Sequence, residues 1–108
     1  MKFSEFAKAF VSATGLPLAY YEFKGDAPSL PFAVYMAVDD DGTVFADNTN
    51  FYKATVIDLE LYFDKKDLAL EKSVESFFDE NEVPFSWDES FIDTEQMFMR
   101  VYEFTLGE

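Results

Sequence analysis

Apolar residues near the start of the chain recur three or four positions apart. The set consists of Phe3, Phe6, Ala7, Phe10 and Val11. This spacing places them on one face of an amphipathic helix and predicts a helix over residues 3–14. Gly15 and Pro17 follow directly and are expected to end it.

A second stretch with helical spacing begins near Asp67. Its apolar positions are Leu70, Val74, Phe77 and Phe78. Either Asp64 or Asp67 is placed to cap the first turn. The helix is expected to stop before Pro84, because proline disfavours helical geometry in the residue that precedes it.

Elsewhere the pattern alternates with a period of two, which is typical of strands. Strands are predicted at residues 18–23, 32–38, 43–46, 52–64 and 95–106, with short extended pieces at 85–87 and 90–92. Asp41-Gly42 indicates a hairpin that pairs residues 43–46 with the preceding strand, and Asp47–Asn50 reads as a further turn.

The strand at 52–64 separates its two sides most clearly. Its apolar side carries Ile57, Leu59, Leu61 and Phe63, and the opposite side carries Asp58, Glu60, Tyr62 and Asp64. One side is therefore predicted to be core, and the other to be wet or to line a cavity.

This order of elements predicts a single α+β domain over residues 1–108. We expect a mostly antiparallel sheet of about four or five strands packed against two helices, in the order α-β-β-β-β-α-β-β.

Both sides of the last strand are apolar. Met97, Met99 and Val101 share one side, and Phe98, Tyr102 and Phe104 share the other beside Arg100. Helices in a two-layer domain cover one face of the sheet. The chain also has 14 Phe, 6 Tyr and 1 Trp, more aromatic residues than one core of this size is expected to hold. We therefore predict that another subunit covers the remainder, with candidate interface residues Tyr62, Phe98, Arg100, Tyr102 and Phe104.

The charge is strongly acidic, with 22 Asp and Glu against 8 Lys and Arg and a formal net charge of −14. Binding to nucleic-acid phosphates requires clustered Lys and Arg that release counterions, so specific nucleic-acid binding is not expected. An acidic membrane surface would repel the chain for the same reason. The sequence also has no run of 18 apolar residues and no signal-peptide pattern, which favours a cytoplasmic protein without membrane contact.

The residue types argue against catalysis. The chain has no Cys and no His, so thiolate ligands and the commonest general base are missing. Asp39-Asp40-Asp41-Gly42 does not fit a calcium loop, because Ala37 and Asn48 would stand at the first and last ligand positions. Close acidic pairs, such as Asp88 with Glu89 and Asp93 with Glu95, are expected in so acidic a chain. We predict no enzyme activity, no metal and no cofactor.

Two stretches suggest a family. IDLELYFDKKDLALEKSVESFFDENEVPF and the closing TEQMFMRVYEFTL resemble the small tail-terminator, or tail-completion, proteins of long-tailed phages and prophages of Gram-positive bacteria. The likeness lies in a strand that ends in Leu61-Tyr62, a helix led by Lys66-Asp67, and a closing strand with Tyr102-Glu103-Phe104. Phe63 replaces the usual Thr of the Leu-Tyr-Thr form.

The resemblance implies a structural protein of the virion, assembled in the host cytoplasm and without catalytic residues. Such subunits form a ring, commonly a hexamer, that caps the tail tube and joins the tail to the head. The implied partners are further copies of the chain, the tail-tube protein and head-tail connector proteins. Asp58, Glu60 and Asp64 are candidates for an acidic lumen, which would repel passing DNA.

The charge also supports a second hypothesis, an acidic DNA mimic that blocks a nucleic-acid-binding protein of the host. In such a protein carboxylates would stand in for phosphates, and binding would depend strongly on salt. A tail-terminator subunit would instead assemble mainly through apolar contacts.

Overall fold

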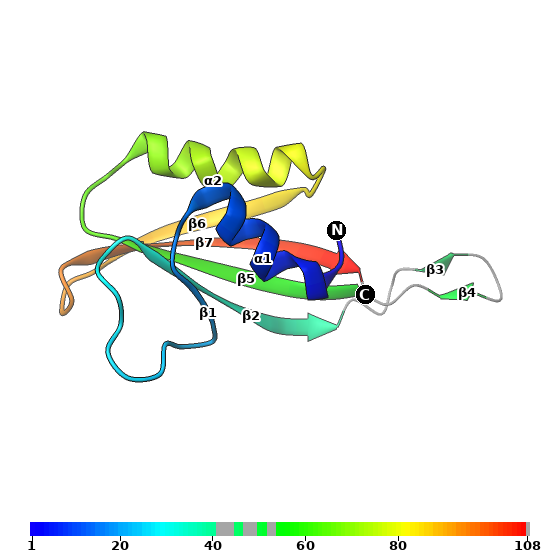
Figure 1. The fold of residues 1–108 in the computed structure, drawn as a ribbon, viewed down its shortest axis with the longest axis horizontal. Coiled ribbons are helices and arrows are strands. Elements are labelled where there is room, and N and C mark those ends of the chain that lie inside the picture. The colour runs from blue at the N-terminus through cyan, green and yellow to red at the C-terminus, as the bar shows by residue number, and fades with distance from the viewer. Residues whose placement is uncertain (41–44, 47–49, 52–53, 108) are drawn as a thin grey trace.

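The computed structural model describes residues 1–40, 45–46, 50–51 and 54–107. Two helices, α1 (Phe3–Thr14) and α2 (Leu68–Glu80), lie side by side on one face of a five-stranded sheet (Figure 1). The predicted α+β class and its helix and strand order are confirmed, apart from one extra short strand. Within the described residues, no helix is long and apolar enough to cross a membrane.

The main sheet contains β1 (Leu18–Tyr20), β2 (Phe32–Asp40), β5 (Ala54–Phe63), β7 (Met97–Gly107) and β6 (Phe85–Ile92), in that spatial order. The last four are antiparallel neighbours, whereas β1 runs parallel to β2. Strands β5 and β7 are therefore central, and β6 and β1 lie at the edges.

Both helices have the expected bounds for physical reasons. Gly15 adopts a left-handed φ of 72° at the end of α1, a conformation that glycine takes without steric cost. Asp67, not Asp64, caps α2, because its carboxylate accepts a hydrogen bond from the Leu70 backbone N–H at 3.1 Å. Helix α2 ends at Glu80, ahead of Pro84 as predicted.

Some strand predictions are wrong in part. The strand predicted at 18–23 ends at Tyr20. The pieces at 85–87 and 90–92 form one continuous strand, since β6 pairs with β7 along its whole length. Phe45–Ala46, which is β3, pairs with Asn50–Phe51, which is β4, and not with the strand at 32–38. The rest of that predicted hairpin, with Asp41 and Gly42, and residues 47–49 of the predicted turn lie outside the described residues. The last residue of that turn, Asn50, belongs to β4.

The core lies between the helices and the sheet. Strand β5 contributes Ile57, Leu59, Leu61 and Phe63, all at most 2% exposed, so its predicted apolar side is confirmed as core. The helices contribute Phe6 and Phe10 from α1 and Val74, Phe77 and Phe78 from α2. Since the described helices pack on this one face, the opposite face of the sheet, called the open face below, has no helix over it (Figure 1).

Candidate functional site

Two of the predicted interface residues are core residues of this chain. Tyr102 is fully buried and Phe104 is 3% exposed, and both face the helices. The prediction that another subunit covers them is therefore wrong. Phe78 from α2 packs against both rings, at 5.6 Å from Tyr102 and 4.7 Å from Phe104, and Phe6 from α1 reaches Phe104 at 5.3 Å. The phenylalanine rings of the two helices thus cover these strand residues, which the spacing of apolar residues in the sequence did not reveal.

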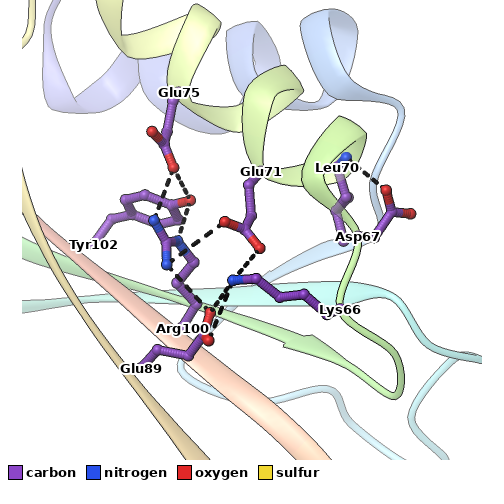
Figure 2. Close-up of polar contacts among 8 residues, drawn as sticks. All are labelled: Lys66, Asp67, Leu70, Glu71, Glu75, Glu89, Arg100 and Tyr102. Atoms are coloured by element: carbon purple, nitrogen blue, oxygen red, sulfur yellow. Dashed lines mark hydrogen bonds and ion pairs between the residues drawn. The ribbon is translucent and has the colours of Figure 1, made fainter.

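Arg100 is also inside, where it forms the centre of an ion-pair network (Figure 2). Its Nη2 donates to Glu75 at 3.0 Å and its Nη1 to Glu89 at 3.2 Å. Its Nε donates to the Tyr102 hydroxyl at 2.7 Å, and that hydroxyl donates to Glu75 at 2.9 Å. Arg100 is therefore not a subunit-interface residue, because its guanidinium N–H groups donate to partners within its own chain.

Lys66 and Glu71 complete this network. Lys66 Nζ lies 2.6 Å from Glu71 and 3.2 Å from Glu89, and Glu71 lies 3.7 Å from Arg100. The bond to Glu71 is the main reason why the pKa of Lys66 is raised. Burial, and the bond to Glu75, raise the pKa of Tyr102 against the opposing effect of Arg100. The network joins α2 to β6 and β7 and so anchors this helix to the sheet.

The single tryptophan covers one side of this anchor. Trp87 on β6 lies with its ring centroid 3.9 Å from the guanidinium carbon of Arg100, a cation–π contact. The residue as a whole is 56% exposed. The sequence predicted a subunit-interface position for Arg100, and no local signal identified Glu71, Glu75 and Glu89 as its partners, because they come from two separate segments, α2 and β6.

Phe98 occupies an intermediate position at the end of the helix-covered face. It is half-buried, with Phe63 at 5.3 Å on one side and Phe91 at 4.9 Å on the other. Phe91 is 44% exposed on the edge strand β6. Phe98 is thus partly enclosed by its own chain. It remains a candidate interface residue only because the adjacent Phe91 is exposed.

Tyr62, the fifth interface candidate, lies on the open face. Side chains that are paired across strands share a face of the sheet, and Tyr62 pairs with Phe32 and Met99. The same alternation assigns further members of the open face, among them Val34, Met36, Val56, Asp58, Glu60, Met97, Val101, Glu103, Ser86, Asp88, Ser90 and Ile92. Many of the apolar ones are only partly buried.

Two of the three predicted lumen acids meet on the open face. Asp58 and Glu60 lie two positions apart on β5, and Asp58 is directly opposite Glu103 on β7. Burial, followed by repulsion from Glu103 and Glu60, raises the pKa of Asp58. Asp64 lies apart from them, exposed in the loop before α2. The structure therefore brings together Asp58 and Glu60 and adds Glu103, which the sequence had not singled out.

A pocket of about 390 Å³ opens at one end of the open face. Tyr62 and Glu60 line it together, and the Tyr62 hydroxyl donates to Glu60 Oε1 at 2.7 Å. Burial, and then this hydrogen bond, raise the pKa of Tyr62. The loop after β1 supplies the opposite wall with Tyr21 and Phe23. The sequence indicated the Glu60–Tyr62 pair through its alternation, but not the loop that folds over it.

Among the described residues, no group of three or more Asp or Glu side chains is arranged to hold a metal ion. The proposed turn Asp39–Gly42 is described only as far as Asp40, which ends β2. No protein-family model matches the chain, and no curated protein is similar to it at a significant level.

Proposed function

We propose that this chain is a non-catalytic structural subunit that assembles through the open face, and that the assembly is the tail-terminator ring indicated by its sequence resemblance. The observation that carries the proposal is the open face itself. One side of a five-stranded sheet has no described helix over it, yet carries Phe32, Tyr62, Met97, Met99 and Val101. A surface of this kind is typical of a protein interface.

The free edges of the sheet are less suited to assembly. On β6 the Glu89 backbone N–H donates to the Asp88 carboxylate at 3.0 Å, and at the end of β2 the Asp40 N–H donates to Asp39 at 2.7 Å. The β6 edge thus uses an acidic side chain to occupy a backbone donor, and so does β2 at Asp40, beyond the residues that β1 pairs with. Acidic edges repel identical edges and discourage strand addition between copies. The open face is the better surface for contact between subunits.

The distribution of charge on the open face suits a ring around DNA. Asp58 and Glu103 lie about four residues along the strands from the aromatic end at Tyr62 and Phe32. The aromatic end would contact a neighbouring protein of the assembly, and the acids would face the passage, where they repel DNA phosphates. The chain would then act in the virion, between the tail tube and the connector proteins of the head.

The decisive experiment measures the oligomeric state by size-exclusion chromatography with light scattering, over a range of protein and salt concentrations. We expect self-association that persists at high salt, alone or after addition of a tail-tube protein. Met99→Glu on the open face should abolish it. Val11→Glu, an equally charged change at an exposed site on α1, should not. A protein that stays monomeric in every condition contradicts the proposal.

The acids Asp58, Glu60 and Glu103 on one face also favour the alternative of a DNA mimic. In that case the same chromatography would show a monomer or dimer. A basic nucleic-acid-binding protein of the host would bind in low salt and be released as salt is raised. Carboxylate-to-amide changes at these acids would then weaken binding, whereas Met99→Glu would not.

A further inference from the structure

The pocket on the open face has walls made of aromatic rings. Phe32 lies between Phe23 and Tyr62, with ring centroids 5.3 Å and 5.4 Å away. Tyr21 stands at the rim and is 64% exposed. The face of an aromatic ring carries negative potential and attracts cations. Four rings around one pocket therefore favour a positively charged group.

Carboxylates strengthen that preference. Glu60 and Glu22 both line the pocket, and no Lys or Arg is among the described residues that do so. Tyr62 holds Glu60 through Oε1. Within the described part of the chain, no hydrogen bond involves the other oxygen of Glu60, so it is available to a donor in the pocket.

The backbone at the rim is held in a strained shape. Tyr21 has a φ of 70°, in the left-handed region that bulky residues seldom adopt. Its N–H donates to the Tyr35 carbonyl at 2.8 Å, and the next N–H, of Glu22, donates to the Tyr20 carbonyl at 2.8 Å. Such strain persists only where the surroundings enforce it, and it is common at ligand clamps. Here it sets Tyr21 and Glu22 at the mouth of the pocket.

We propose that this pocket binds the guanidinium group of an arginine from a different partner protein. A planar guanidinium stacks on aromatic rings and donates in a fork to carboxylates, so it fits these walls better than an ammonium group does. Because Tyr21 leaves the pocket open to water, a small free cation would stay hydrated on one side. An arginine carried by a protein gains further contacts with Met97, Ile92 and the rest of the open face.

The partner cannot be a second copy of this chain. Arg100 is its only arginine, and that side chain is buried and paired with three glutamates. This inference rests on the proposed function, because it assumes that the open face contacts other proteins. It adds that part of this face receives an unlike protein, such as a neighbour at one end of the ring.

The test is a titration of the ¹⁵N-labelled protein by NMR, at a concentration where it is monomeric, with the capped peptide Gly-Arg-Gly. We expect shifts at the amides around Tyr62, Phe32 and Tyr21. The matched peptide Gly-Gln-Gly should cause none, and Gly-Lys-Gly and tetramethylammonium should bind several-fold more weakly. Glu60→Gln should weaken binding of the arginine peptide about fivefold, the effect of one exposed ion pair.

Glu103→Gln is the control, since it removes the same charge from the same face outside the pocket lining. It should change the affinity less than twofold. Equal binding of the arginine and glutamine peptides, or of the arginine peptide and tetramethylammonium, would overturn the proposal. So would an equal effect of the two Glu variants. Self-association is measured separately, so its absence leaves this titration informative, and peptide binding can fail while the ring still forms.

Discussion

Replacing Arg100 with Met would leave Glu71, Glu75 and Glu89 facing one another without their buried cation. Removing one partner of a buried ion pair typically costs about 3–5 kcal/mol of the free energy of unfolding. We expect Arg100→Met to fall in that range in urea denaturation. Lys66→Met, at the half-exposed end of the same network, should cost about 1 kcal/mol or less. Equal stability of the Arg100 variant and the native protein would refute the anchoring role.

Asp58 affects the stability of the fold in a pH-dependent way, and in its charged form it destabilises the fold, whereas Arg100 stabilises it. Its raised pKa means that the folded protein holds this proton more tightly than the unfolded chain does. The resulting stability is complete below the ordinary Asp pKa and is lost as pH rises through the raised value. At a pH above that raised value the carboxylate of Asp58 faces Glu103, so Asp58→Asn should there raise the free energy of unfolding by about 0.5 kcal/mol.

That gain should shrink when urea denaturation is repeated near pH 4, where the native Asp58 is more fully protonated. Asp64→Asn is the control, because it removes the same charge at an exposed loop position away from Glu103 and should change the stability little. An Asp58 variant that is less stable than the native protein at neutral pH would disprove the repulsion between Asp58 and Glu103.

Helix α2 offers a test of a single capping residue. Asp67→Ala removes the acceptor of the Leu70 N–H and should cost about 1 kcal/mol of stability. Asp64→Ala, three residues earlier, should cost almost nothing, although the sequence left both residues open as caps. Thermal unfolding followed by circular dichroism separates the two variants. If both lose the same stability, the capping contact is not the cause.

At the level of elements, local sequence patterns predicted the positions of helices and strands better than they predicted which strands pair. Both helices follow from the spacing of their apolar residues, and α1 has the bounds predicted. Strand β6 was divided in two because Asp88 and Glu89 interrupt its apolar pattern, yet pairing with β7 keeps it extended. Partners such as β3 with β4 cannot be read from period alone, because any two alternating segments are compatible.

For the whole molecule, the sequence predicted the α+β class and the two sides of β7, but not what covers each side. Alternation grouped Tyr102 and Phe104 correctly, yet how much of them Phe6 and Phe78 would bury depends on how the helices pack. The candidate site shows the same limit. Tyr62 and Glu60 are neighbours on one strand and were both identified, whereas Tyr21 and Phe23 reach them only through the path of a loop.

Trp87 gives the molecule a built-in optical reporter. It is the only tryptophan, and it lies on the guanidinium that holds α2 to the sheet. Its emission spectrum should therefore change when α2 separates from the sheet, even if the strands stay paired. A fluorescence transition that coincides with the loss of circular dichroism would indicate that helix and sheet separate in a single cooperative event.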